Sequence, residues 1–202
     1  MGALLKSDIE TQRYTYEDYA KWELAQGERF ELIDGVPYAM AAPSVKHQDA
    51  VGEIFVQLKN FLRGKSCRVF IAPFDVCLNA KGNKDKNVVQ PDILVVCEPK
   101  KLADGKRCNG APDLAIEVLS PSNENHDSFV KFNLYRQAGV REYWVVNPEN
   151  ETVHKYVLQN KKYVAEVYST QDIVPVNVLN GCEIDLKLVF EVENQEQEQV
   201  IT

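Results

Sequence analysis

The feature of this chain that most constrains its fold is a pair of short segments that are apolar on both faces of a β-strand. Asp92 precedes the run Ile93–Val96, and such a run is typical of a strand in the middle of a sheet with both faces covered. In Leu114–Leu119, the alternation of side chains places Glu117 on a face whose other members are apolar. The two segments therefore predict a buried sheet with one carboxylate on each of two strands.

The residues before these strands predict two helices and a hairpin. Thr15 and Asp18 have the spacing of a capping box, which predicts a helix over residues 15–25. Asp34-Gly35 is the predicted turn of a β-hairpin, and Ser44 is the predicted N-cap of a second helix. An apolar stripe at helical spacing follows Ser44 and consists of Val51, Ile54, Phe55, Leu58 and Leu62. The stripe predicts the face of the helix that packs on the sheet.

The rest of the chain alternates in the same way. Strands are predicted in 67–72, 74–79 and 142–147. A helix is predicted over 125–138, ending at Gly139. A late hairpin is predicted from strands 151–158 and 161–169, with its turn at Gln159-Asn160. Helices and strands in this order predict an α/β fold with a mixed central sheet flanked by helices. We expect a single domain over residues 1–190 and an acidic, disordered tail over residues 191–202.

The composition excludes several classes of protein. No apolar run approaches the roughly 18–20 residues that a membrane-spanning helix needs. Five scattered cysteines, without a CxxC motif, argue against both a disulfide framework and a zinc site, so we expect a reduced, cytoplasmic protein. The net charge of −7 does not favour long-range attraction of nucleic acid. Four acids lie in the last twelve residues, which leaves 26 acids against 23 bases elsewhere, so a DNA-binding face is permitted but not indicated.

Asp92 and Glu117 are the candidate catalytic residues. Burying an ionised carboxylate costs several kcal/mol unless a partner offsets the cost. A hard divalent cation is one such partner, because Mg²⁺ takes one or two carboxylates and keeps positions for water and phosphate. The alternative is structural: Asp92 caps a turn, and Glu117 pairs with an Arg or Lys across the sheet. The two acids together, with a lysine-bearing helix directly after the second strand, favour the catalytic interpretation.

Several motifs resemble one known family. They are ELIDG in Glu31–Gly35, His47 on the next helix, Pro91-Asp92, EVLSPS in Glu117–Ser122 and AGVREYW in Ala138–Trp144. Together they resemble the Uma-type restriction endonucleases of the PD-(D/E)xK nuclease superfamily, over residues 13–188. The resemblance implies an αβββαβ core of the restriction-endonuclease-like kind. It also implies that Asp92 and Glu117 bind Mg²⁺, with Mn²⁺ as the substitute, and that a lysine acts on the attacking water.

This chain departs from the superfamily at the lysine. The third position of the Glu-x-Lys motif is Leu119, and the residue that matches in the Uma-type family is Lys131 on the following helix. Tyr135 lies four positions later, on the same helical face. We therefore expect the Lys131 ammonium within hydrogen-bonding or short electrostatic range of Glu117 or Asp92.

Three further residues are supporting candidates. Glu31 and His47 match positions that the resemblance points to, and His47 faces inward with the apolar stripe, where a buried, hydrogen-bonded histidine is the simpler interpretation. Asp75 alternates with Cys77 and Asn79, so it faces either solvent or the cleft.

The expected activity is Mg²⁺-dependent hydrolysis of DNA phosphodiester bonds. Two alternatives stay open: a non-catalytic binding module that keeps the nuclease fold, and a metal-dependent phosphoesterase on a small nucleotide, which the acidic composition favours. We also expect a two-fold homodimer, because two sites suit two DNA strands. Aromatic residues on the late strands exceed the predicted needs of a monomer core; they are Tyr143, Trp144, Tyr156, Tyr163 and Tyr168.

Overall fold

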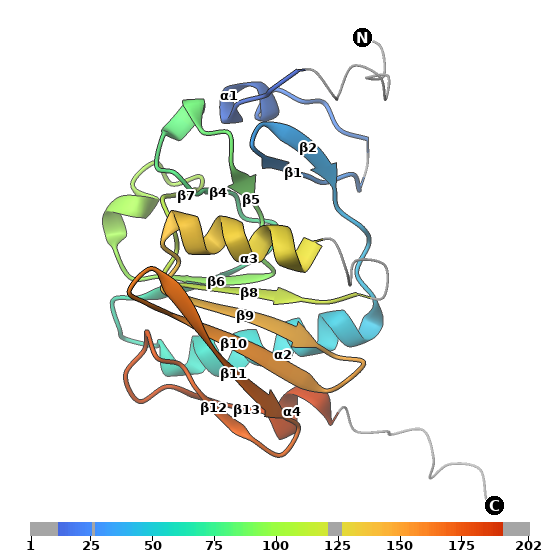
Figure 1. Ribbon diagram of the computed structural model, residues 1–202, viewed down its shortest axis with the longest axis vertical. Helices are drawn as coiled ribbons and strands as arrows, with labels where there is room; N and C mark the ends of the chain where they lie inside the picture. The colour runs from blue at the N-terminus through green and yellow to red at the C-terminus, as the bar shows by residue number, and fades with distance from the viewer. Residues whose placement is uncertain (1–11, 26, 121–126, 192–202) are drawn as a thin grey trace, which may run out of the picture.

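The computed structural model describes residues 12–25, 27–120 and 127–191, with the side chains of the third helix described from residue 130 (Figure 1). From residue 192 onward, the predicted acidic tail lies outside the described residues. The described chain forms a six-stranded sheet, a five-stranded sheet and a two-stranded sheet. No helix among the described residues is long and apolar enough to cross a membrane.

The six-stranded sheet has the order β11-β10-β9-β8-β6-β3. β8 and β9 are parallel and the other pairs are antiparallel, so the sheet is mixed, as predicted. All residues of β6 and β8 are buried, as their apolar sequences require. The strands are β3 (Arg68–Ile71), β6 (Ile93–Val96), β8 (Leu114–Val118), β9 (Glu142–Asn147), β10 (Thr152–Gln159) and β11 (Lys162–Ser169).

Two long helices cover opposite faces of this sheet. α2 (Val45–Phe61) begins after Ser44, whose side chain accepts a hydrogen bond from His47 N at 3.2 Å. α3 (Asp127–Ala138) ends before Gly139, which has φ +87°, a conformation that glycine adopts without strain. The first two residues of the predicted third helix lie outside the described residues. In Figure 1, α2 runs behind the strands and α3 in front of them. The elements α2, β3, β6, β8, α3 and β9 occur in the order of the expected αβββαβ core, with short strands of a second sheet inserted between them in the chain.

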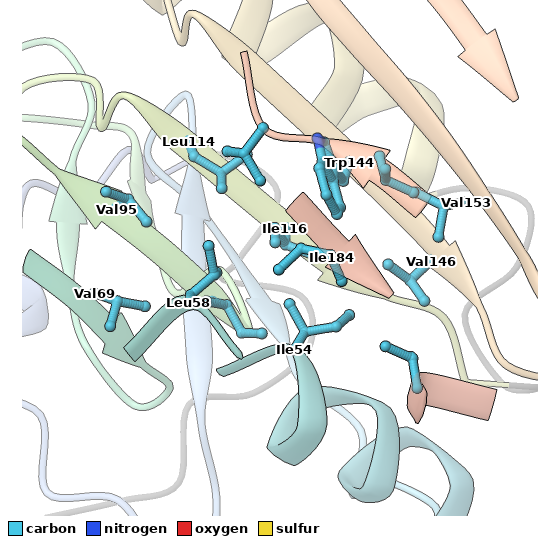
Figure 2. Packing of buried hydrophobic residues seen from close by; sticks show 14 of the residues in the cluster. Ile54, Leu58, Val69, Val95, Leu114, Ile116, Trp144, Val146, Val153 and Ile184 are labelled. Carbon is cyan, nitrogen blue, oxygen red and sulfur yellow. The ribbon is translucent and has the colours of Figure 1, made fainter. Parts of the chain in front are cut away.

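The alternation of side chains along β8 separates two hydrophobic cores. Ile116 and the other residues on its face pack with Ile54 and Leu58 of α2 (Figure 2). Ala115 lies on the opposite face and packs with Tyr135 of α3. Full burial of each large aliphatic side chain contributes about 1.5–3 kcal/mol, so the buried stripe is enough to hold α2 on the sheet. Glu117, two residues after Ala115, therefore faces α3.

The five-stranded sheet has the order β2-β1-β5-β4-β7, and sequence analysis did not predict it as a separate sheet. β1 and β2 form the predicted hairpin, with Asp34 and Gly35 at φ +51° and +76°. The other three strands are two residues long, too short for a periodic pattern. The strands are β1 (Phe30–Ile33), β2 (Val36–Ala39), β4 (Val76–Cys77), β5 (Val88–Val89) and β7 (Cys108–Asn109).

The smaller elements differ from prediction in extent. α1 (Tyr16–Tyr19) has the predicted capping box of Thr15 and Asp18, but it ends well before residue 25. The late hairpin turns at Asn160-Lys161, one residue later than predicted. Of two 3₁₀ turns, η1 (Gly82–Lys84) connects β4 to β5, and η2 (Pro99–Leu102) lies between β6 and β7. The late hairpin is followed by β12 (Ile173–Pro175), β13 (Glu183–Asp185) and α4 (Leu186–Phe190).

The structure corrects the prediction that the chain contains no disulfide. Cys67 and Cys97 are joined, and both lie just outside the antiparallel pair β3–β6. Arg68 pairs with Val96, so the next pair is Cys67 opposite Cys97. Cross-strand neighbours have Cβ atoms about 4.5–5.5 Å apart, which brings two cysteines at these positions close together. The other three cysteines are free and buried.

The aromatic residues of the late strands are used inside the chain, so the argument from them for a dimer is wrong. Tyr143 and Trp144 are fully buried. The rings of Tyr156 and Tyr163 pack edge-on against Phe132 of α3, with centroids 5.0 and 5.2 Å away. These contacts complete the core under α3.

Candidate functional site

Asp92 and Glu117 lie opposite one another on neighbouring strands. β6 and β8 are antiparallel and Ile93 pairs with Ile116, so the next pair along is Asp92 and Glu117. Residues directly opposite in a sheet point to the same face. Glu117 faces α3, and Asp92 lies close enough to raise the pKa of Glu117, but the contacts of Asp92 are with His47 of α2 and the backbone of Val118. The side chains of Asp92 and Glu117 are 14% and 11% exposed, so a small part of each remains open to solvent.

Two groups hold Asp92. The backbone N–H of Val118 donates to Asp92 Oδ2 at 2.8 Å. The Nε2 atom of His47 lies 3.2 Å from the same oxygen, on α2 one turn after its N-cap. His47 is buried, and its Nδ1 atom has no hydrogen-bond partner among the described residues. The supporting candidate His47 thus contacts the candidate metal ligand Asp92 through Nε2, and its side chain is buried.

Lys131 reaches the same site from α3. Its Nζ atom lies 3.1 Å from Glu117 Oε1 and 3.0 Å from each oxygen of Glu31, where both acids are buried. Tyr135, one helical turn later, donates to Glu117 Oε1 at 2.5 Å. The expected position of the Lys131 ammonium is confirmed. Its side chain is only 6% exposed, which is rare for a lysine and reflects its two carboxylate partners.

The contacts fall on one oxygen of each candidate metal ligand. Within the described part of the chain, Val118 N and His47 meet Asp92 Oδ2, and Lys131 and Tyr135 meet Glu117 Oε1. Asp92 Oδ1 and Glu117 Oε2 are therefore the oxygens left to face a further partner. Each oxygen of a carboxylate can accept about two hydrogen bonds. Because the contacts gather on one oxygen of each carboxylate, they fix the orientation of both groups.

The electrostatics of the site favour an additional cation. Burial is the largest cause that raises the pKa of Glu117, to about 8; Lys131 opposes it, while Glu31 and Asp92 add to it. Burial also raises the pKa of the Tyr135 phenol well above its ordinary value. The phenol therefore stays protonated and donates a hydrogen bond to Glu117. The ammonium of Lys131 thus contacts the carboxylates of Glu31 and Glu117, and the charge of Asp92 acts on Glu117 as well.

A divalent metal fits two of these carboxylates, not three. Among the described residues there is no group of three or more His, Cys, Asp and Glu side chains arranged to hold a metal ion. Asp92 and Glu117 provide hard oxygen donors at adjacent positions, and the charges of Glu31 and Asp92 both act on Glu117. Mg²⁺ commonly uses one or two carboxylates and completes its shell with water. The donor set therefore suits Mg²⁺ or Mn²⁺ better than a softer metal.

Asp75 joins a second polar group beside the first. Its Oδ1 atom accepts hydrogen bonds from Gln90 Nε2 at 2.9 Å and from Tyr19 OH at 3.2 Å. The backbone N–H of Gln90 donates to Glu31 Oε1 at 2.8 Å, which links this group to the lysine. Asp75 meets neither candidate metal ligand in these contacts. Sequence analysis missed Gln90, whose signal is a buried polar residue between a strand and Pro91-Asp92.

The family model described as "Putative restriction endonuclease", Uma2, matches residues 16–187. A protein of Synechocystis sp., "Uncharacterized protein slr1290", is 32% identical in an alignment of 127 positions that covers 59% of this chain and 60% of that protein. The chain therefore matches less than two thirds of that relative's length. The fold also resembles that of a crystal structure titled as a "putative nuclease belonging to DUF820", from Anabaena variabilis. The TM-score is 0.69 at 20% identity, over 87% of this chain and 97% of the other. This chain belongs to the Uma2 family of restriction-endonuclease-like proteins.

Proposed function

We propose that this protein is a metal-dependent endonuclease that hydrolyses DNA phosphodiester bonds. One observation carries the proposal: the carboxylates of Asp92 and Glu117 stand at adjacent positions of β6 and β8, and the ammonium of Lys131 contacts Glu117. Two carboxylates and one lysine are the groups that metal-assisted phosphodiester hydrolysis needs. Membership of a nuclease family supports the reaction class.

Asp92 and Glu117 would hold Mg²⁺ or Mn²⁺ through Asp92 Oδ1 and Glu117 Oε2, since the other oxygen of each is engaged. When bound, such a cation polarises the scissile phosphate and lowers the pKa of a coordinated water. Lys131 would orient the attacking water and stabilise the negative charge that develops on the phosphate. His47 and Tyr135 would keep the two acids in place, as outer partners of metal ligands commonly do.

A basic groove supports a polyanionic substrate. Lys81, Lys101 and Arg141 line one open groove of about 530 Å³. Asp113 at the start of β8 also lines it and pairs with Arg141 at 3.0 Å. Asp113 and Glu117 are four residues apart in the sequence, which corresponds to about 13 Å along a strand. DNA crossing both places would present several phosphates, which a small nucleotide would not.

The phosphoesterase alternative retains one supporting observation, the net charge of −7, which repels DNA at long range. The alternative of a non-catalytic module predicts that the site binds no metal. A two-fold dimer and a cytoplasmic location remain predictions, and the Cys67–Cys97 disulfide is more typical of an oxidising compartment. Sedimentation at micromolar concentration tests the dimer, and a monomer there would contradict it.

The direct test uses purified protein with supercoiled plasmid and with a set of mononucleotides, each with Mg²⁺, Mn²⁺ or EDTA. We expect cleavage of the plasmid with either metal, none with EDTA, and none by Asp92→Asn. Asp104→Asn, an exposed aspartate outside the site, serves as the matched control and should cleave normally. Hydrolysis of nucleotides without DNA cleavage would favour the phosphoesterase, and no metal-dependent activity on either substrate would contradict the proposal.

A further inference from the structure

Glu31 lies on the other side of Lys131 from Glu117, and it comes from the other sheet. It belongs to β1 of the five-stranded sheet, while Glu117 belongs to β8 of the six-stranded sheet. Lys131 Nζ is 3.0 Å from both oxygens of Glu31 and 3.1 Å from one oxygen of Glu117. Glu31 is 2% exposed, so its charge is buried and needs this partner.

The position of Glu31 does not depend on Glu117. Its Oε1 atom accepts the backbone N–H of Gln90 at 2.8 Å, and its strand is paired with β2 along its whole length. Glu31 is therefore held by the backbone of the five-stranded sheet. The lysine, by contrast, has a long and flexible stem that can shift between two acids.

A divalent cation on Glu117 changes the balance at the lysine. The ammonium next to Glu117 would then face a like charge at short range, and a low local dielectric makes such repulsion large. Without another partner, Lys131 would either compete with the cation for Glu117 or leave the site. Glu31 offers a buried carboxylate that meets the ammonium through both oxygens.

We propose that Glu31 is a positioning residue that retains Lys131 when Glu117 binds a divalent cation. The proposal rests on the proposed function, since it presumes a metal on Glu117. Glu31 acts through the lysine and does not itself bind the metal. The ion pair that Glu31 and Glu117 share would then be held by Glu31, so the lysine stays at the site while Glu117 becomes available.

The test is a double-mutant cycle on Mn²⁺ affinity, measured by calorimetry on the full chain without DNA. The variants are Glu31→Gln, Lys131→Met and the double variant, because glutamine keeps an acceptor for Gln90 N and removes only the charge. Glu31→Gln should weaken Mn²⁺ binding by about 10–100-fold, the usual effect of losing an outer partner of a metal site. In the Lys131→Met background, the same change should alter the affinity less than about threefold, because no lysine remains to compete.

Two controls make the outcome decisive. Glu183→Gln changes the charge equally on the exposed residue of β13 and should leave Mn²⁺ affinity unchanged. Glu31→Asp keeps the charge and should restore much of the affinity if Glu31→Gln folds poorly. Equal weakening by Glu31→Gln in both backgrounds would mean that Glu31 acts on the metal directly and would overturn the inference. Unchanged affinity in Glu31→Gln would also overturn it, whereas a wild type that binds no Mn²⁺ would overturn the proposed function itself.

Discussion

The Nζ atom of Lys131 lies 3.1 Å from Glu117 Oε1, although the two residues are separated by the end of a strand and the start of a helix. Tyr135 donates to the same oxygen from one helical turn further on. The position that carries lysine in the usual Glu-x-Lys motif is Leu119, which packs partly buried in the core under α3. A helical lysine thus supplies positive charge at the carboxylate where the strand supplies none.

Lys131→Met should abolish cleavage without weakening metal binding. Methionine keeps much of the buried stem and removes the charge, so the carboxylates lose a competitor but the reaction loses charge stabilisation. We expect at least about a 100-fold fall in cleavage rate, the usual cost of removing one preorganised charge-stabilising group. Calorimetry with Mn²⁺ on the same preparation checks metal binding. Lys162→Met, on exposed β11, is the control and should retain full activity.

Tyr135→Phe should destabilise the protein, because the buried Glu117 carboxylate loses a hydrogen-bond donor. A hydrogen bond to a charged group contributes about 1.5–3 kcal/mol, so urea denaturation above pH 8, where Glu117 is ionised, should show a loss in that range. Tyr163→Phe removes a hydrogen bond to a neutral group, the carbonyl of Val140, and should cost less. Equal losses in the two variants would show that the Tyr135–Glu117 contact has no special weight.

The stability of the metal-free protein should fall as the pH rises through the titration of Glu117. The pKa of this carboxyl is raised from 4.5 in the unfolded chain to about 8 in the folded one. The folded state therefore holds the proton more tightly, and this stabilisation is complete below pH 4.5 and lost as the pH approaches 8. The melting temperature of the wild type minus that of Glu117→Gln, followed across the pH range, isolates the effect of Glu117 from that of other titrating groups. A difference curve that rises with pH would contradict the sign, and added Mg²⁺ should oppose the fall.

The disulfide predicts a specific count of free thiols. Denatured protein should react at three cysteines before reduction and at five after it, because Cys77, Cys108 and Cys182 are free. Alkylation followed by mass spectrometry measures both numbers. Five reactive thiols before reduction would support the reduced state that the cysteine spacing predicts.

Much of the site follows from the sequence because its acids interrupt strong apolar patterns. Asp92 and Glu117 are conspicuous in strands that are otherwise apolar, and helical spacing places Lys131 and Tyr135 on one face. The contact between Glu31 and Lys131 spans 100 residues and two sheets, and no local pattern reports it. Gln90 follows β5, a strand of two residues that has no readable period.

Strand register explains the disulfide that the sequence failed to predict. Cys67 and Cys97 have no local motif, and they become neighbours only once β3 and β6 pair with Arg68 opposite Val96. The two-fold alternation of a strand identifies its faces but not its partner. The same limit applies to Asp92 and Glu117, whose adjacent positions are predictable only after β6 and β8 are known to be neighbours.

The central claim is that Lys131 supplies the positive charge that position 119 lacks, and relocating the charge tests it most directly. Leu119 is on the same face of the strand as Glu117, so a lysine there approaches the site from the usual motif position. The measurement is the rate of plasmid cleavage with Mg²⁺ by wild type, Lys131→Met and the double variant Leu119→Lys/Lys131→Met. We predict that Lys131→Met is inactive and that the double variant regains measurable cleavage that EDTA abolishes. Cleavage by Lys131→Met at the wild-type rate would contradict the account.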